Sequence, residues 1–245
     1  MTKIGIFGSN GRMGRAIAEV IADSEATLAG GADKGDDAAA VARASDVIVD
    51  FSSRAALGEH LAAARAAGTA IVLGTTGLGP EHHAMIDEAA RAIPVLQAAN
   101  TSLGVNLLAH LVRETATRLG ADWDIEIVEM HHRHKVDAPS GTGLLLGNAA
   151  AAGRGVELAA VATHGRHGIT GERPEGAIGF GVLRGGSVAG DHQVIFAGEG
   201  ERIELGHRAE SRVIFAQGAV KAALWGRGRQ PGLYSMADVL GLDSL

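Results

Sequence analysis

The sequence predicts an α/β protein whose N-terminal part contains a parallel sheet and whose middle part is an inserted α+β unit. Two observations predict this division. Short apolar runs alternate with helical stretches through the first hundred residues, which is typical of a parallel sheet with crossover helices. From Trp123 onward the apolar residues instead recur at a period of about two, as in strands with one wetter face.

The composition is that of an ordinary globular protein, with 46% apolar and 20% charged residues among 245. A net charge of −6 gives no global electrostatic reason to expect nucleic acid as a partner. The chain has no cysteine, which excludes disulfides, thiolate zinc sites and cysteine nucleophiles. The first residues lack a signal-peptide pattern, and the apolar runs are shorter than a membrane span. We therefore expect a cytoplasmic protein with no membrane partner.

The first part of the chain predicts five strands in regular succession with helices. An apolar run ends at Gly8 and is followed by an amphipathic helix over about 12–22. A helix over about 55–67 ends at Gly68, where a C-cap glycine is expected, and Pro80 opens another helix at its first position. Ser102 is expected to cap a long helix that reaches about residue 119. The predicted strands are 4–7, 27–32, 46–51, 70–73 and 94–97.

The later part predicts a strand from Trp123 and then a series of strands joined by glycine-rich turns, which resemble antiparallel strands. These cover 178–183, 192–197, 202–207 and 212–215. The tail, 216–224 and 236–240, returns to helical periodicity. We interpret residues 1–102, completed by 212–245, as a dinucleotide-binding domain, and residues 103–211 as a domain for substrate binding and oligomerisation.

The nucleotide assignment comes from the glycine-rich turn after the first strand. The turn runs from Gly8 to Gly14 with the spacing G-x-x-G-x-x-G, which permits a tight turn and a close backbone approach to a pyrophosphate at a helix N-terminus. Asp33 ends the second strand, where a carboxylate can accept hydrogen bonds from an adenosine ribose. Lys34 and Arg12 could instead pair with a 2′-phosphate, so the choice between NADH and NADPH stays open. A glycine turn without a ligand, and Lys34 as a solvated loop charge, are the alternatives.

Two further loops follow predicted strands at their carboxyl ends, where an open parallel sheet binds its ligands. Their small and hydroxyl side chains would let a nicotinamide ring meet backbone groups, although either loop can also be a plain turn. The loops are Gly74-Thr75-Thr76-Gly77 and Ala98-Ala99-Asn100-Thr101.

The stretch 129–142, EMHHRHKVDAPSGT, predicts an anion site. Five successive residues from His131 to Lys135 can carry positive charge, and a buried cluster of this kind is costly unless an anion fills it. Ser140 or Thr142 can cap a helix over about 143–152, whose free N–H groups would bind a carboxylate. With Lys135 and one histidine at the other end of a dianion, a small dicarboxylate is the natural ligand.

Three alternatives compete with the anion site. A solvated basic loop explains the charges but not the adjacent capped helix. A zinc site of His131, His132 and His134 needs convergent geometry, whereas neighbouring histidines on a strand point to opposite faces, so we expect no metal. Ser140 as an activated nucleophile lacks a G-x-S-x-G elbow.

The stretch 129–142 is similar, without gaps, to the signature of the dihydrodipicolinate reductase family, now named 4-hydroxy-tetrahydrodipicolinate reductase. The resemblance extends over nearly the whole chain through further segments in the right order: Gly8 to Gly14, Asp50-Phe51-Ser52, Gly74 to Gly77, Ala98-Ala99-Asn100, Gly168 to Gly171, Glu201-Arg202, and Ser211-Arg212 through Trp225.

The resemblance implies a Rossmann-type domain for NADH or NADPH, a hinge, and a mixed-sheet substrate domain that forms a homotetramer. It implies that His131 is the catalytic acid/base and Lys135 a proton donor, in a reduction that gives tetrahydrodipicolinate for lysine biosynthesis through diaminopimelate. Substrate contacts would fall on His132, Lys135, Ser140, Gly141 and Thr142. Cofactor contacts would fall on Gly8, Ser9, Asn10, Gly11, Arg12, Met13, Asp33, Gly74, Thr75, Thr76, Ala98, Ala99, Asn100 and Thr101, and we add Lys34.

The sequence departs from the family in two places. The segment between Asp33 and Asp46 is short, which predicts an abbreviated wall on the adenosine side, and Gly143 stands where alanine is commoner, which should slightly loosen the helix start. A non-catalytic NAD(P)-binding metabolite sensor remains the alternative of another class. A reductase similar to aspartate-semialdehyde dehydrogenase needs a cysteine nucleophile, which this chain lacks.

Overall fold

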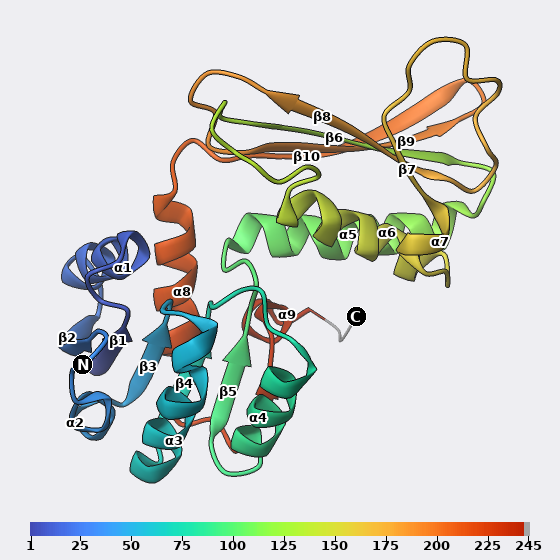
Figure 1. Ribbon diagram of the computed structural model, residues 1–245. Helices are drawn as coiled ribbons and strands as arrows, with labels where there is room; N and C mark the ends of the chain where they lie inside the picture. Colours follow the sequence, from blue (N-terminus) through green and yellow to red (C-terminus); the bar gives the residue numbers. More distant parts are fainter. Residues whose placement is uncertain (243–245) are drawn as a thin grey trace. The chain divides into compact units, whose positions relative to one another are not determined.

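The computed structural model describes residues 1–242, which divide into two compact units. The first unit comprises residues 1–103 and the described residues from Val213 onward, and the second comprises Gly104–Arg212. The elements of both units are labelled in Figure 1. Among the described residues no helix is long and apolar enough to cross a membrane.

The first unit is built on a six-stranded sheet in the order β11-β5-β4-β3-β1-β2, and all of its pairings are parallel. The strands are β1 (Thr2–Phe7), β2 (Ala26–Ala32), β3 (Val47–Asp50), β4 (Ala70–Leu73), β5 (Pro94–Gln97) and β11 (Gly232–Tyr234). Strands β3 and β4 are buried along their whole length, which is why they consist of continuous apolar runs.

Helices cover both faces of this sheet, so two apolar clusters form. One face carries α1 (Arg12–Ala22), α8 (Val213–Gly226) and α9 (Met236–Leu240). The other carries α2 (Ala38–Ala44), α3 (Leu57–Ala67, after the short 3₁₀ turn η1 at Arg54–Ala56) and α4 (Pro80–Ala90). This arrangement confirms the predicted Rossmann-type fold.

The glycine and proline signals of the sequence correspond to observed helix ends. Gly68 follows α3 in the left-handed conformation at φ 65°, and Pro80 is the first residue of α4. The elements α2 and β11 of this unit were not predicted, and neither were the 3₁₀ turn η1 and, in the second unit, α7 (Leu158–Val161) and β7 (Ala162–His164). The short segment after Asp33 contains α2, and Asp37 caps this helix by accepting from the Ala40 N–H.

One predicted strand is wrong. Residues 212–215 lead into α8, which begins at Val213, and are not a strand. The apolar run Val213-Ile214-Phe215 is too short to distinguish the period of a strand from that of a helix. The buried positions further along, Ala216, Ala219, Val220 and Ala223, have the spacing of a helix that packs on the sheet.

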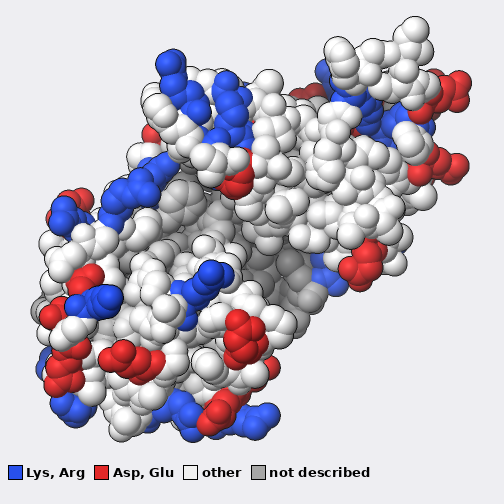
Figure 2. Space-filling view, viewed as in Figure 1, with Lys and Arg blue, Asp and Glu red and all other residues white. Residues whose placement is uncertain are grey.

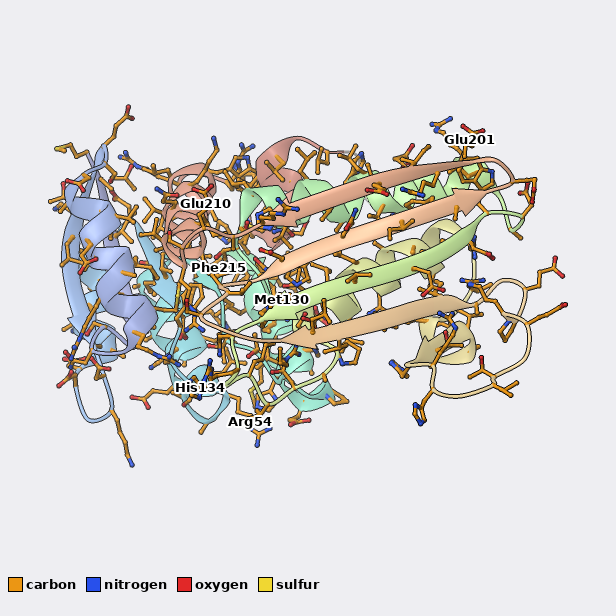
Figure 3. The ribbon with its side chains drawn as sticks, turned by 90° about the horizontal axis from the view of Figure 1, so that it is seen from above. Arg54, Met130, His134, Glu201, Glu210 and Phe215 are labelled. Atoms are coloured by element: carbon orange, nitrogen blue, oxygen red, sulfur yellow. The ribbon has the colours of Figure 1, made fainter. Side chains whose placement is uncertain are left out.

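The second unit is a five-stranded mixed sheet in the order β10-β9-β6-β8-β7. Its strands are β6 (Asp124–His131), β7 (Ala162–His164), β8 (Ile178–Arg184), β9 (Asp191–Gly198) and β10 (Glu201–Arg208). Helices α5 (Leu103–Leu119), α6 (Gly141–Gly153) and α7 (Leu158–Val161) all lie on one face of this sheet, as Figure 1 shows. Figure 3 looks onto the sheet, with Met130 and Glu201 near its opposite ends.

The expectation that the later strands are antiparallel is wrong for β8. This strand runs parallel to both β6 and β7, whereas β9 runs antiparallel to β6 and β10. The long connections that parallel pairing requires are present, because α6 and α7 lie between β6 and β7, and residues 165–177 join β7 to β8.

Strand β6 extends from the apolar core of the second unit to a buried polar end. Its residues alternate strictly between half-buried and buried, and the buried ones are Ile125, Ile127, Glu129 and His131. The first two pack in the apolar cluster with α5 and α6. The same buried face therefore changes from apolar to polar over the last three residues of the strand.

Candidate functional site

The carboxyl end of β6 brings a carboxylate and an imidazole together. Glu129 and His131 are 1% and 8% exposed, and they share one face because residues two apart on a strand point the same way. Nδ1 of His131 lies 2.6 Å from Oε2 of Glu129. The imidazole is thus anchored through one nitrogen, and its Nε2 is the atom left for chemistry.

Glu129 is saturated with hydrogen bonds. Besides His131, it accepts from the Ser140 N–H at 3.0 Å and from both terminal nitrogens of Arg184, at 2.8 and 3.0 Å. Burial raises the pKa of Glu129, but the hydrogen bonds from Arg184, His131 and Ser140 more than offset burial and hold this pKa below its usual value. The carboxylate is therefore ionised at neutral pH.

Nε2 of His131 lies beside Gly190, and its ring lies beside that of His192. A Cβ at position 190 would stand 3.0 Å from His131 Nε2, so a glycine there keeps the nitrogen accessible. The His131 and His192 rings meet edge to face with centroids 5.0 Å apart. Burial, and then the charge of His131, lower the pKa of His192 to about 4, so that His192 is a neutral neighbour.

The N-terminus of α6 lies next to these groups. Ser140, 1% exposed, is the N-cap, and its Oγ accepts from the Gly143 N–H at 3.0 Å. The helix begins at Gly141, two residues earlier than predicted, and Ser140 rather than Thr142 is its cap. Gly141 and Thr142 stand in the first turn of α6, the end of a helix that favours an anion.

The other basic residues of the stretch are more exposed. Lys135 forms an ion pair of 2.9 Å with Asp137, and the hydrogen bond from Lys135 lowers the pKa of Asp137. His132 Nε2 lies 2.9 Å from a terminal nitrogen of Arg212, and its pKa is lowered by burial first and then by the Arg212 charge. Arg133 and His134 are exposed. The predicted positive cluster is thus partly compensated by Glu129 and Asp137.

The metal and nucleophile alternatives can be compared with this geometry. Within residues 1–242, no group of three or more His, Asp or Glu side chains is arranged to hold a metal. Ser140 Oγ does lie 3.2 Å from Nε2 of His192. However, this oxygen is fully buried and already caps α6.

In the first unit, the glycine loop makes the close contacts expected of it. Gly8 has φ +79°, and a side chain at Gly14 would overlap the Gly8 carbonyl oxygen and Ser9. Asp33 accepts from Ser9 Oγ at 2.7 Å and from the Asn10 N–H at 3.0 Å. Gly11 occupies the N-cap position of α1 and, as a glycine, provides no side-chain cap hydrogen bond. Arg12 and Met13 are the first residues of the helix.

This loop borders a cavity of about 580 Å³. Of the predicted cofactor residues, Gly8, Gly11, Asp33 and Lys34 line it. It is completed by residues that were not predicted as site residues: Gly35, Asp36, Ala38, Phe51, Ser52, Ser53, Ala55, Ala56, Glu59 and His60. Acidic and basic groups occur together here, and Figure 2 shows both kinds interspersed over the visible face of this unit.

The two other predicted cofactor loops do not line the cavity. Gly74 packs against Phe51, and Thr75 is buried with its Oγ1 unpaired among the described residues. The Ala98 N–H donates to the Leu73 carbonyl at 3.0 Å, and Thr101 Oγ1 donates to the Phe215 carbonyl at 2.7 Å. Thr76, Ala99 and Asn100 follow the same two strand ends, β4 and β5, which are neighbours in the sheet.

Sequence reasoning missed Glu129, Arg184, His192 and Arg212 as members of the second-unit site. One signal was available for Glu129, because alternation along β6 puts it on the face of Ile125 and Ile127, where an unpaired carboxylate would be costly. The other three come from distant parts of the chain. Sheet pairing brings Arg184 and His192 close, as in the Glu129–His192 register of β6 and β9, and Arg212 is placed by its contact with His132.

Family models match both halves of the chain. The model described as "Dihydrodipicolinate reductase, N-terminus" matches residues 2–101, and the one described as "Dihydrodipicolinate reductase, C-terminus" matches residues 104–240. Together they cover nearly the whole sequence.

Curated relatives and solved structures agree with these matches. The chain is 58% identical to a protein of Zymomonas mobilis named 4-hydroxy-tetrahydrodipicolinate reductase, over 98% of this chain and 97% of that one. It is 54% identical to a protein of the same name from Acidiphilium cryptum, over 98% of each. The fold is similar to that of dipicolinate-bound dihydrodipicolinate reductase from Paenisporosarcina sp. TG-14, with a TM-score of 0.80 and 22% identity over 97% of this chain and 98% of that one.

Proposed function

The chain belongs to the dihydrodipicolinate reductase family, and from this membership we propose that it is a 4-hydroxy-tetrahydrodipicolinate reductase. It transfers a hydride from NADH or NADPH to a cyclic conjugated imine dicarboxylate and gives tetrahydrodipicolinate, in lysine biosynthesis through diaminopimelate. The observation that carries this proposal is the similarity over nearly the full chain to relatives of that name, at 58% and 54% identity.

The substrate is held in the second unit. Its carboxylates are bound by the N–H groups of Gly141 and Thr142 at the start of α6, where the helix dipole favours an anion. Lys135 exchanges its ion pair with Asp137 for a substrate carboxylate, and His132 supports the site through its contact with Arg212. The similar reductase from Paenisporosarcina binds dipicolinate, and this planar dicarboxylate is the probe of choice here.

The nucleotide is held in the first unit. The cavity beside the glycine loop, together with the close approach of Gly14 to Gly8, fits a pyrophosphate and an adenosine. Ser9, Asn10, Arg12 and Met13 complete the loop before and at the start of α1, and Asp33 and Lys34 would contact the ribose. The loops of Gly74–Thr76 and Ala98–Thr101, at the ends of β4 and β5, would hold the nicotinamide side. The bound nucleotide supplies the hydride.

His131 is the acid/base group that transfers the proton. Hydride addition leaves an electron-rich carbon that must be protonated, and an imidazole with its Nδ1 anchored on Glu129 presents Nε2 for this transfer. Lys135 supplies positive charge next to the carboxylate and serves as a proton donor.

We also propose an assembly and a location for this protein. The face of the second sheet away from α5 and α6 carries Val128, Met130, Leu183 and Ile195, of which Leu183 is 52% exposed. Glu126, with Arg166 and Arg173, lies on the same side, so the apolar residues form only part of this face. The exposed apolar part supports a homotetramer formed through the second unit. The absence of cysteine and a biosynthetic role support a cytoplasmic location. Light scattering in solution and cell fractionation test these two points.

The decisive experiment follows oxidation of the reduced nicotinamide with freshly generated substrate, with NADH and NADPH in parallel. A reductase consumes cofactor only when substrate is present. A protein that binds dipicolinate and NADH but consumes neither nucleotide would instead be a metabolite sensor, and the proposal would fail.

A further inference from the structure

Glu129 receives four hydrogen bonds from three different parts of the second unit. Its Oε2 contacts His131 Nδ1 and Arg184, and its Oε1 contacts the Ser140 N–H and Arg184. Each oxygen therefore joins one group of the proposed site to the same guanidinium. The side chain is 1% exposed, so these bonds are not shared with bulk water.

The bond to His131 fixes the protonation pattern of the imidazole. A carboxylate only accepts hydrogen bonds, so Nδ1 must carry the hydrogen, and in the neutral ring Nε2 is the free base. Without this partner, the proton could reside on either nitrogen, and the ring could rotate. A carboxylate that holds the tautomer and stabilises the imidazolium is a recurrent way to orient a catalytic histidine.

The bond to Ser140 fixes the helix start. Ser140 donates its N–H to Glu129, while its Oγ accepts from Gly143. The residue immediately before Gly141, where α6 begins, is thereby held on both sides. Glu129 thus ties the orientation of the imidazole to the position of the helix terminus proposed to bind a carboxylate.

Arg184 keeps Glu129 ionised and connects it to the loop that carries Lys135. Its two-pronged contact holds Glu129 ionised in a buried place, and its guanidinium also donates to the Asp137 carbonyl at 2.6 Å. Asp137 is the ion-pair partner of Lys135. The loop that carries the lysine is therefore attached to the same carboxylate through one arginine.

We propose that Glu129, held by Arg184, is a positioning residue for the reaction: it sets the Nδ1–H tautomer of His131 and aligns that imidazole with the substrate-binding start of α6. This inference rests on the proposed function. It gives a specific role to a residue pair whose hydrogen bonds join other residues of the proposed site.

The test is Glu129→Gln in the full chain, with Glu126→Gln as the matched control. Glu126 lies on the same strand, faces the other side, and also binds two arginines, Arg166 and Arg173. In Glu129→Gln we expect kcat to fall at least about 10-fold, with the KM for NADH or NADPH unchanged because the first unit is untouched. The control keeps the kcat of the unaltered chain.

A second readout does not depend on turnover. Nitrogen NMR of labelled histidine distinguishes the two neutral tautomers, and His131→Gln identifies the His131 signals. We expect His131 to be in the Nδ1–H form in the unaltered chain and in Glu126→Gln, and to become mixed or shifted to Nε2–H in Glu129→Gln. An unchanged tautomer together with an unchanged kcat in folded Glu129→Gln overturns the inference.

Because Glu129→Gln leaves the half-buried guanidinium of Arg184 without its carboxylate partner, the variant can lose stability. The double variant Glu129→Gln/Arg184→Gln removes both charges together, and circular dichroism shows whether it is folded. A folded double variant with low kcat and a mixed tautomer supports the inference, and one with normal kcat overturns it. If the unaltered chain fails to oxidise cofactor, the proposed function fails, while the NMR comparison still decides the role of Glu129 toward His131.

Discussion

Ser140 Oγ lies 3.2 Å from Nε2 of His192, although the two residues are 52 positions apart in the chain. Both are buried, at 1% and 5% exposure. Ser140 Oγ accepts from the Gly143 N–H, and a hydroxyl with a second lone pair and its own hydrogen can either donate to His192 Nε2 or accept from it. The cap of α6 is therefore tied to His192, a buried imidazole.

The burial of His192 predicts a loss of stability in mild acid. Burial first, then the His131 charge, lower the pKa of His192 from 6.5 to about 4. The unfolded chain takes up a proton below about pH 6.5 and the folded one only near pH 4, so stability is complete above pH 6.5 and is lost as pH falls toward 4. The contribution is on the order of 3 kcal/mol at most. Chemical denaturation at several pH values measures it.

His192→Gln is the comparison for this prediction. A glutamine cannot titrate, so the dependence of unfolding free energy on pH between 6.5 and 4.5 should flatten. The contribution of Glu129, whose pKa is also lowered, is lost only below about pH 4.5. An equally steep slope in His192→Gln would show that another group is responsible.

The second prediction concerns the proposed acid/base pair. His131→Gln should lower kcat by about 10²- to 10⁴-fold, because general acid–base catalysis contributes in this range. Lys135→Ala should lower kcat and also weaken dipicolinate binding, because it removes a charge from the carboxylate site. Both variants should bind NADH as the unaltered chain does, since the nucleotide is held in the other unit. Steady-state kinetics and calorimetry measure these effects.

His134→Gln is the matched control for His131→Gln, because His134 is exposed and makes no hydrogen bond to the buried carboxylate. It should retain the kcat of the unaltered chain. If His131→Gln and His134→Gln had equal activity, His131 would not be the proton-transferring group.

The third prediction addresses the choice of nucleotide. Asp33 and Lys34 line the same cavity, but a carboxylate suits a free ribose hydroxyl and a lysine suits a 2′-phosphate. Lys34→Ala should therefore raise the KM for NADPH more than that for NADH. Asp33→Asn should do the reverse, and it also weakens the contacts to Ser9 and Asn10. Parallel kinetics with the two nucleotides give the ratio of the KM for NADPH to that for NADH. If this ratio were unchanged in both variants, Asp33 and Lys34 would not determine the choice of nucleotide.

Much of the first unit could be predicted from sequence because its signals are local. Gly68, Pro80 and the apolar runs of β3 and β4 each constrain the backbone within a few residues. The parallel direction of β8 could not be predicted, because its apolar pattern is the same whichever way its neighbours run. Likewise, β11 has only three residues and depends on pairing with β5.

The site was predicted where its residues are close in sequence and missed where they are not. His131, Lys135 and Ser140 lie within ten positions, so one motif contains them. Arg184 and His192 reach Glu129 and Ser140 only through the pairing of β8 and β9 with β6. A pattern of single residues carries no information about that register. The loops after β4 and β5, in contrast, were predicted from strand ends alone, and their role stays a prediction.

The last prediction concerns Gly218 in the interior of α8. A side chain there would overlap the carbonyl oxygen of Thr101, which is backbone and cannot move as a side chain can. Thr101 is also held against the same helix, because its Oγ1 donates to the Phe215 carbonyl at 2.7 Å. The overlap must therefore be relieved by shifting α8 away from the sheet, where Ala219 and Val220 are packed in the core.

Gly218→Ala should destabilise the first unit by about 1–3 kcal/mol, the usual cost of overpacking. The control is Gly226→Ala at the end of the same helix, where an added Cβ meets nothing within 4 Å. Replacing that glycine should leave stability unchanged or slightly higher, because alanine favours the helix. Denaturant titration of both variants measures the difference. Equal stability of the two would mean that the contact between α8 and the Thr101 backbone is loose enough to absorb a methyl group.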